Sequence, residues 1–211
     1  MLNSSYKLGI IPAAGKAIRF GGVLKELLPL PNGSSFLREC YNRLKPYCTD
    51  VLVITTDDKI QRHAAELGRD VIYIVQRYDN DIWGAIKTAL DIPAGNYLFS
   101  MPDTYLDRYT FSNYRDSDFG MGLFDTNYPE RFGCLMGGEI VNKMSGLPTP
   151  AKAWGVLAWS RAVADYWLKY PQPDYTFAIN AAIINFVYTQ WRIAVYYDNA
   201  SITDYVEILI S

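Results

Sequence analysis

Two cations, Arg19 and Lys25, lie in a glycine-containing loop directly after the first apolar run of the chain, in the stretch LGIIPAAGKAIRFGGVLKELLPL that spans residues 8–30. A glycine-rich turn lets backbone N–H groups converge on an anion, because glycine adopts backbone angles that other residues avoid. At an effective dielectric constant near 20, each cation a few ångströms from a phosphate contributes about 4 kcal/mol before desolvation. The loop therefore suits a phosphate-bearing ligand and a transition state in which negative charge moves.

The two familiar phosphate-loop patterns do not match this stretch. In GxxxxGK[ST], Ile10 stands where the first glycine belongs and Ala17 follows Gly15-Lys16. In GxGxxG, Ala17 occupies the position of the second glycine. From these residues alone, a generic anion-binding loop and a turn with solvated charges stay open as equal alternatives.

Two aspartates follow later apolar runs: Asp103 in NYLFSMPDTYL and Asp198 in IAVYYDNASITDYVEIL. A divalent metal such as Mg²⁺ prefers oxygen ligands, commonly one or two carboxylates. An aspartate after a strand is also a common turn residue. Ser201 and Asp204 form a capping box for a last helix, so Asp198 is not needed as its cap.

The elements that must position these residues alternate along the first half of the chain. Short apolar runs predict strands, and patterns with apolar residues three and four apart predict helices between them. The predicted strands are 8–13, 50–56, 70–76 and 96–103, and the predicted helices are 34–47, 59–68 and 81–90. This alternation predicts βαβ units in a mostly parallel sheet covered on both faces. Ligands bind such sheets outside the carboxyl ends of the strands, where the loop 15–29 begins.

The second half of the chain predicts strands without helices between them, at 118–126, 132–144 and 153–160, which extend the sheet or add a small β ribbon over one end. Helices at 161–170 and 177–189, a strand at 191–198 and a last helix at 201–209 follow. No repeat or linker interrupts the pattern, so we expect one α/β domain over residues 1–211.

Composition excludes several function classes. A formal net charge of −2 disfavours nucleic-acid binding as the main function, and no apolar run approaches the roughly 20 residues that span a bilayer. The N-terminus lacks the layout of a secretory signal, and the cysteines show no metal or disulfide spacing, so we expect a cytoplasmic protein with reduced thiols. His63 is the only histidine, which nearly excludes a Cys/His zinc site; we expect it to be a solvated or half-buried structural residue.

The stretch IPAAGKAIRFGGVLKELLPL resembles the signature of the sugar-phosphate nucleotidyltransferase family, which includes sugar-1-phosphate nucleotidylyltransferases and cytidylyltransferases. That signature is a strand, then A/G-A/G-G-x-x-x-R, several residues, and K-x-L-L-P. The matching residues here are Gly15, Arg19, Lys25, Leu28 and Pro29. The resemblance runs from residue 8 to residue 208 and implies a three-layer α/β/α, Rossmann-like (GT-A-like) fold with a mostly parallel, mixed sheet.

The sequence departs from this signature at three loop positions. Ala17 and Ile18 stand where the family often has Gly and Thr or Ser, and Leu24 precedes Lys25 where Pro is common. A less pliable loop weakens nucleotide binding without abolishing it.

The resemblance implies roles for residues of the nucleotide half. In the family the loop wraps the triphosphate, which implies nucleotide contacts at Ala13, Ala14 and Gly15 and catalytic roles for Arg19 and Lys25 along the phosphates. Asp103 and Asp198 match the family's two metal-binding aspartates and imply Mg²⁺ as the cofactor, with Asp103 also at the nucleotide. Gln76, at the end of the third predicted strand, matches a glutamine that often touches the base; a surface glutamine is the equal alternative.

The acceptor half matches the family less closely. Gly133, Lys143 and Gly155 fall on positions that line the family's sugar-phosphate pocket. Asn142 replaces the Glu that commonly holds sugar hydroxyls, and Met144 replaces a Pro, so a glucose-type acceptor is in doubt.

The resemblance implies a Mg²⁺-dependent nucleotidyltransferase whose partners are a nucleoside triphosphate and a phosphorylated small molecule, with neither a membrane nor a nucleic acid involved. A sugar 1-phosphate is the first expectation; a cytidylyltransferase acting on phosphocholine or another alcohol phosphate, and a non-catalytic nucleotide-binding homologue, are the alternatives. The chain leaves no room for the C-terminal repeats or second catalytic domain of some relatives, so we expect neither. Monomer and homo-oligomer both stay open, as do the base and the pathway.

Overall fold

The computed structural model describes residues 6–16, 23–79, 81–114 and 117–198. Its large sheet is built from β1 (Lys7–Pro12), β2 (Asp50–Thr55), β3 (Ile72–Val75), β4 (Asn96–Ser100), β6 (Phe119–Thr126), β7 (Gly133–Met136), β8 (Glu139–Asn142), β9 (Ala151–Ser160) and β10 (Tyr188–Arg192). A separate two-stranded sheet joins β5 (Thr104–Leu106) to β11 (Val195–Asp198).

The strand order β10-β6-β9-β4-β1-β2-β3 combines a parallel half with an antiparallel insertion. β4, β1, β2 and β3 run parallel to one another, so their carboxyl ends lie at one edge. β9 runs antiparallel to β4 and to β6, while β10 is parallel to β6. The expectation of a mixed, mostly parallel sheet is confirmed.

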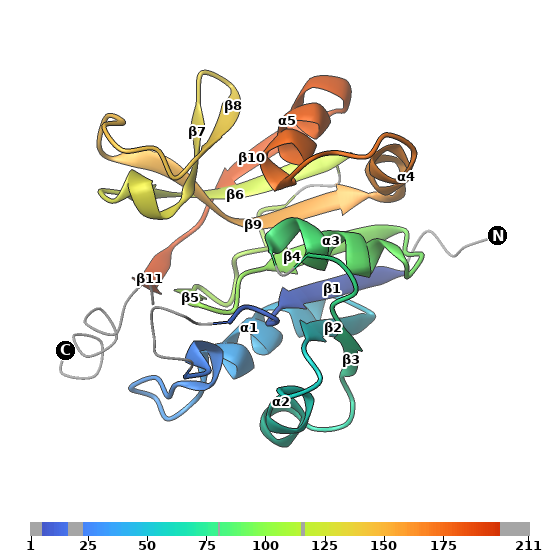
Figure 1. The fold of residues 1–211 in the computed structure, drawn as a ribbon. Helices are drawn as coiled ribbons and strands as arrows, with labels where there is room; N and C mark the ends of the chain where they lie inside the picture. Colours follow the sequence, from blue (N-terminus) through green and yellow to red (C-terminus); the bar gives the residue numbers. More distant parts are fainter. Residues whose placement is uncertain (1–5, 17–22, 80, 115–116, 199–211) are drawn as a thin grey trace.

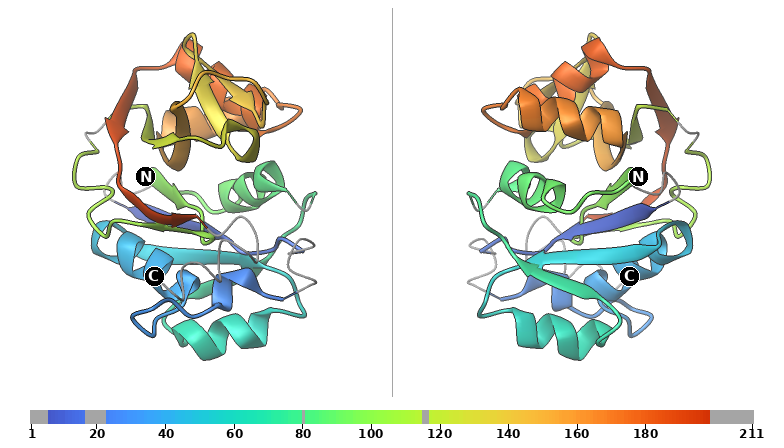
Figure 2. Two further views of the ribbon diagram at one scale, coloured as in Figure 1. Left: turned by 90° about the vertical axis from the view of Figure 1, so that its left-hand side faces the viewer. Right: turned by 90° about the vertical axis from the view of Figure 1, so that its right-hand side faces the viewer.

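Helices cover both faces of the sheet (Figures 1 and 2). The helices are α1 (Phe36–Leu44), α2 (Ile60–Leu67), α3 (Ile82–Leu90), α4 (Arg161–Lys169) and α5 (Tyr175–Asn185), with short 3₁₀ turns η2 (Lys25–Leu27), η3 (Lys45–Tyr47) and η4 (Pro129–Arg131). One core cluster contains Trp83 of α3, Trp167 of α4 and Ile179 of α5, and the other contains Leu37 of α1 and Leu67 of α2. The chain therefore folds as the expected three layers.

Side-chain caps fix where several helices begin. Ser35 Oγ accepts the backbone N–H of Arg38 at the start of α1, and Asp81 Oδ1 accepts the N–H of Gly84 at the start of α3. Asp174 Oδ1 accepts two backbone N–H groups at the start of α5. Such caps satisfy the N–H groups that a helix leaves without partners in its first turn.

The C-terminal elements differ from the sequence expectation at two places. The helix predicted for 177–189 ends at Asn185, because Phe186 is extended and the β-favouring residues after it pair with β6 as β10. The strand predicted for 191–198 is divided: β10 ends at Arg192, and β11 begins at Val195 in the other sheet. The helix predicted for 201–209 lies outside the described residues.

The segment expected as one strand at 132–144 is the hairpin β7–β8, which turns at Gly137 and Gly138, both with positive φ. β7 pairs with the start of β9, which also carries β6 on its other side. The β6–β9 register runs from Gly122↔Val156 to Leu123↔Trp154, so Gly155 is the extra residue of a β-bulge. The hairpin is thus attached to the sheet through β9, and β8 lies beside α5 (Figure 1).

In the described part of the chain, no helix is both long and apolar enough to cross a membrane.

Candidate active site

A cavity of about 180 Å³ opens where the parallel strands β1, β3 and β4 end. Its walls come from four segments that lie far apart in the sequence. The lining residues are Pro12, Ala13, Ala14, Gly15, Lys25, Glu26, Gln76, Asp81, Ile82, Met101, Pro102 and Asp103. The expected position of the ligand site, outside the carboxyl ends of the strands, therefore coincides with an actual cavity.

Lys25 and Asp103 meet at this cavity, although 78 positions separate them in the sequence. The turn η2 carries Lys25, and Asp103 follows β4. Lys25 Nζ donates to Asp103 Oδ2, and the two side chains are 28% and 20% exposed. Both charges therefore stay within reach of a ligand.

The backbone of Asp198 lies next to the Asp103 turn. β11 pairs antiparallel with β5, and the register places Asp198 opposite Thr104. The backbones of the two predicted metal ligands, Asp103 and Asp198, thus lie at adjacent strand ends. Arg19 lies outside the described residues.

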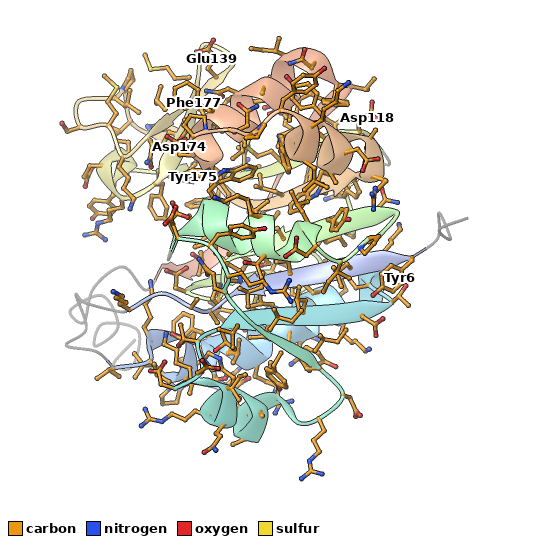
Figure 3. All side chains as sticks on the ribbon, turned by 45° about the vertical axis from the view of Figure 1, so that its right-hand side comes forward. Tyr6, Asp118, Glu139, Asp174, Tyr175 and Phe177 are labelled. Carbon is orange, nitrogen blue, oxygen red and sulfur yellow. The ribbon has the colours of Figure 1, made fainter. Side chains whose placement is uncertain are left out.

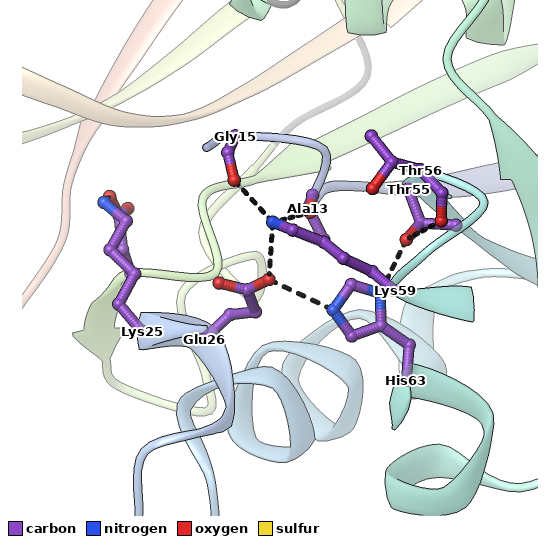
Figure 4. A network of polar contacts seen from close by, with 9 residues as sticks. Ala13, Gly15, Lys25, Glu26, Thr55, Thr56, Lys59 and His63 are labelled. Atoms are coloured by element: carbon purple, nitrogen blue, oxygen red, sulfur yellow. Dashed lines mark hydrogen bonds and ion pairs between the residues drawn. The ribbon is translucent and has the colours of Figure 1, made fainter. Parts of the chain in front are cut away.

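A network of buried charges lies under the loop of residues 13–25 (Figure 4). Lys59, directly before α2, donates from Nζ to Ala13 O at 3.1 Å, to Gly15 O and to Glu26 Oε1 at 3.2 Å. Glu26 Oε1 also lies 3.1 Å from His63 Nε2. Lys59 is 5% exposed, Glu26 3% and His63 0%.

The expectation that His63 is solvated or half-buried is wrong. Its Nδ1 lies 2.9 Å from Thr55 Oγ1 and its Nε2 faces Glu26, so both ring nitrogens have partners inside the protein. The amphipathic pattern of α2 places a histidine on the buried face equally well, and only the acidic partner from η2 makes that position favourable.

The ionised form of Glu26 is favoured in this network. Burial by itself would raise the pKa of Glu26, but the hydrogen bond from His63 and the positive charge of Lys59 outweigh burial and hold that pKa below its ordinary value. Lys59 and Glu26 thus form an ion pair inside the protein.

Arg43 of α1 approaches the Asp103 turn from inside the protein. It is 1% exposed; Nη1 donates to Ser100 Oγ at 2.6 Å, and Nη2 lies 3.4 Å from Thr104 O. Its Nε has no hydrogen-bond partner among the described residues, and burial lowers the pKa of its guanidinium. Arg43 therefore ties together the two ends of the short segment that carries Asp103.

Gln76 lines the cavity, as expected, but its amide group is partly engaged. Nε2 donates to Asp79 O and, at 3.2 Å, to Asp81 O. Only Oε1 is left to meet a ligand, so Gln76 can offer an acceptor and not the donor-acceptor pair that its amide suggests. Asp81 is the cap of α3.

The three acceptor candidates do not line this cavity. Close packing explains why positions 133 and 155 are glycines. A Cβ on Gly133 would lie 2.4 Å from Trp154 Nε1, and one on Gly155 would lie 3.0 Å from Ile193 Cδ1. Lys143 is exposed at the end of β8 and has a left-handed backbone, with φ of 50°. Their assignment to the acceptor stays a prediction.

Asn142 is held by an aromatic residue at the start of α5. Tyr175 OH donates to Asn142 Oδ1, so the amide oxygen is occupied and the NH₂ group is left for other partners. Burial raises the pKa of Tyr175 to about 12, which keeps this hydroxyl protonated. Figure 3 shows Asp174 and Tyr175 where α5 begins, next to α3.

A larger groove of about 600 Å³ lies elsewhere, beside β6, β10 and β11. None of the predicted site residues lines it, and the one arginine on its wall, Arg192, pairs with Asp125 at 3.4 Å. The smaller cavity is the better candidate because the strand ends, the loop and the Lys25–Asp103 pair all meet there.

In the part of the chain that the structure describes, no three His, Cys, Asp or Glu side chains cluster as metal ligands do. A divalent ion here would depend on the hard carboxylate oxygens of Asp103 and Asp198 and on oxygens of a bound polyphosphate. One or two carboxylates plus substrate phosphates are a common donor set for Mg²⁺, so the residues fit such an ion.

Sequence reasoning missed Glu26, Lys59 and Arg43. Glu26 lies at the variable position of the K-x-L-L-P stretch. Lys59 and Arg43 belong to helical patterns in which a charged residue is expected to be solvated. Only their tertiary partners distinguish them from surface residues.

Comparisons with known proteins agree with this geometry. Residues 9–113, from β1 to the segment after β5, match the family described as the MobA-like NTP transferase domain. No curated protein matches the chain by sequence.

Several solved structures share the fold at low sequence identity. A candidate glucose-1-phosphate thymidylyltransferase from Bacillus anthracis is 20% identical, with a TM-score of 0.82 over 97% of this chain and 94% of that one. A UDP-glucose pyrophosphorylase complexed with UDP-glucose is 14% identical, with a TM-score of 0.75 over 97% of each chain. The inositol-1-phosphate CTP transferase from T. maritima is 12% identical, with a TM-score of 0.70 over 100% of this chain and 97% of that one.

Proposed function

Because the chain belongs to the nucleotidyltransferases with a MobA-like NTP transferase domain, we propose that it joins a nucleoside triphosphate to a sugar 1-phosphate in a Mg²⁺-dependent reaction. The products are a nucleoside diphosphate sugar and pyrophosphate. One observation carries the proposal: residues 13–15, Lys25, Asp103 and the backbone of Asp198 meet at the carboxyl ends of the parallel strands.

The reaction needs no histidine base. A phosphate monoester is already anionic at neutral pH, so an oxygen of the acceptor phosphate attacks the α-phosphorus directly. The bond from the α-phosphorus to the bridging oxygen breaks, and pyrophosphate leaves with that oxygen. Catalysis then consists of alignment and charge neutralisation. The burial of His63 away from the cavity is consistent with this chemistry.

Four charged side chains have a proposed part in this reaction. Lys25 bridges the phosphates of the bound triphosphate, and Arg19 stabilises the leaving pyrophosphate. Asp103 and Asp198 would hold Mg²⁺, which when bound neutralises charge on the polyphosphate. The contact of Lys25 with Asp103 compensates both charges, and a flexible lysine can exchange that carboxylate for a phosphate.

An alcohol phosphate is the second candidate for the acceptor. Asn142 with its NH₂ group free supports it, since a neutral amide replaces the family's carboxylate. The fold likeness to an inositol-1-phosphate CTP transferase over 100% of this chain also supports it. A non-catalytic nucleotide-binding protein is the third reading.

A pyrophosphate-release assay tests the proposal. Each common nucleoside triphosphate is incubated with Mg²⁺ and one acceptor from a panel of sugar 1-phosphates, phosphocholine and an inositol phosphate. We expect release with at least one sugar 1-phosphate; release only with an alcohol phosphate would select the second candidate. Tight nucleotide binding without any release would select the third.

Two variants connect the assay to the cavity. Lys25→Ala should reduce kcat by about 100-fold or more, because an oriented charge is lost from the transition state. Lys169→Ala, on the outer end of α4, is the matched control and should retain full turnover. Equal turnover of the two variants would contradict the role of Lys25.

A further inference from the structure

We propose that Lys59 is a positioning residue that turns the backbone N–H groups of Ala14 and Lys16 toward the bound polyphosphate. The inference rests on the proposed function, because it assigns the phosphates to the same loop. Lys59 itself does not touch the ligand in this scheme; it acts through the peptide groups that it holds.

The ammonium group of Lys59 is completely used inside the protein. It has three protons and no accepting atom, and three oxygens surround it: Ala13 O, Gly15 O and Glu26 Oε1. Two of these are carbonyls of the loop and one is the carboxylate beside Lys25. With 5% of its surface exposed, Lys59 has no proton left for solvent or for a ligand.

The direction of the two carbonyls determines the direction of the next N–H groups. In a trans peptide the C=O and the N–H point to opposite sides, and the only cis bond of the described residues is Thr149–Pro150. Ala13 O and Gly15 O point inward to Lys59, so the N–H groups of Ala14 and Lys16 point away from it. Ala13, Ala14 and Gly15 are among the residues that line the cavity. Backbone N–H groups that are turned toward such a concave site can bind an anion.

Lys59 also joins the two ends of the loop. Its ammonium group binds the carbonyls of Ala13 and Gly15, directly after β1, and the carboxylate of Glu26 in η2. Gly15 and Glu26, which flank the loop, therefore contact the same ammonium group. Lys25 precedes Glu26 directly. Fixing Glu26 therefore also fixes the backbone from which Lys25 reaches Asp103.

A buried cation needs a partner that cannot move away, and Glu26 is held in that way. Because Glu26 accepts, His63 Nε2 must carry the proton and donate, and His63 Nδ1 is anchored at Thr55 Oγ1, 2.9 Å away. Thr55 is the last residue of β2 and is itself fully buried. The chain of contacts thus runs from the sheet to the loop.

The test measures how tripolyphosphate with Mg²⁺ binds to the full chain, using titration calorimetry. Tripolyphosphate has no base and no acceptor group, so its affinity reports only on phosphate binding. The measurement does not require turnover. Lys59→Met removes the ammonium group but leaves Glu26 buried without its cation. The double variant Lys59→Met/Glu26→Gln removes both charges and keeps an oxygen for His63, so it should fold even if the single variant does not.

A matched control separates positioning from general stability. Val163→Ala truncates a fully buried residue of α4, which is not among the residues that line the cavity, and destabilises the protein without touching the loop. We expect the double variant to bind tripolyphosphate at least tenfold more weakly than the unmodified chain, and Val163→Ala to bind it with unchanged affinity. Equal weakening in both, or none in the double variant, overturns the positioning role and leaves the proposed function standing.

The unmodified chain provides an independent readout. Labelled with ¹⁵N, it should show shifts of the Ala14 and Lys16 amide signals when tripolyphosphate is added, and the double variant should lose them. Binding without these shifts contradicts the inference alone. Failure of the unmodified chain to bind tripolyphosphate overturns both the inference and the proposed function.

Discussion

At the scale of single residues, two buried cations stand behind the candidate site and differ in how their charge is compensated. Lys59 has the carboxylate of Glu26 at 3.2 Å, whereas Arg43 donates to the hydroxyl of Ser100 and the carbonyl oxygen of Thr104. Burying a charge is costly unless it is paired and hydrogen-bonded. The two residues should therefore respond differently to substitution.

Glu26→Gln should destabilise the protein at neutral pH by about 3 kcal/mol, because it leaves Lys59 buried without a countercharge. The pKa of Glu26 is lower in the folded chain, so its stabilising contribution is present above the unfolded pKa and is lost as pH falls through the folded pKa. Urea unfolding of the unmodified chain and of Glu26→Gln should be measured between pH 7 and pH 3. The difference between their free energies of unfolding should become smaller below about pH 4.3, the ordinary pKa of glutamate. A gap independent of pH would contradict the ion pair.

Arg43→Met should leave the free energy of unfolding within about 1 kcal/mol, since an apolar side chain of similar length removes a charge that burial disfavours. Turnover should nevertheless fall about tenfold, because the segment 100–104 loses the guanidinium that ties Ser100 to Thr104 around Asp103. Chemical denaturation and the pyrophosphate assay give the two numbers. A variant with full turnover would show that the strand pairing alone positions Asp103.

At the scale of elements, the start of α3 shows why one glycine is required near the site. A Cβ on Gly84 would lie 1.8 Å from Asp79 O and 2.7 Å from Gln76 Nε2, so Gln76 and Asp79 can approach the helix only because no side chain is there. Asp81 caps the same turn through the N–H of Gly84. The helix start and the cavity wall are therefore one unit.

Gly84→Ala should weaken nucleotide binding although alanine is the better helix former by about 1 kcal/mol. The added methyl group pushes Gln76 and Asp79 away from α3 and deforms the cavity wall. Equilibrium binding of the preferred triphosphate measures the effect, with Lys87→Ala in the same helix as the control. Unchanged affinity in Gly84→Ala would show that the wall at Gln76 does not meet the nucleotide.

At the scale of the whole molecule, the site collects segments from both ends of the chain. Its walls come from residues 12–15, 25–26, 76, 81–82 and 101–103, and β11 brings residue 198 back beside Thr104. A ligand held by such distant segments binds the folded chain and not the unfolded one, so it must raise the melting temperature.

A nucleoside triphosphate at about 100 times its Kd, with Mg²⁺, should stabilise the fold by about 2.7 kcal/mol. For a chain of this size that corresponds to a rise in Tm of roughly 5–10 °C. Asp103→Asn should lose the part of the rise that depends on Mg²⁺, which thermal scans with and without the metal will measure. An equal rise in both proteins and in both buffers would contradict metal binding at Asp103.

The sequence by itself determined the layered α/β architecture and the place of the site. Alternating apolar periods predict βαβ units, and parallel strands bring their carboxyl ends to one edge, so the loop after β1 and the aspartate after β4 had to meet there. Lys25 and Asp103 could be selected because they match motif positions of the family that the sequence resembles, Lys25 in K-x-L-L-P and Asp103 after an apolar run.

Only the tertiary structure decided which strand each late segment joins and which charges are buried. Periodicity indicates that a segment is extended but does not indicate which strand it pairs with. The sequence therefore could not predict that the chain leaves one sheet after Arg192 and joins the other at Val195. Each of Glu26, Lys59, His63 and Arg43 has a hydrogen-bonding or charged partner that lies 33 or more positions away along the chain. A charged side chain in a helix is solvated by default, and only an oppositely charged or hydrogen-bonding partner from another element can make its burial favourable.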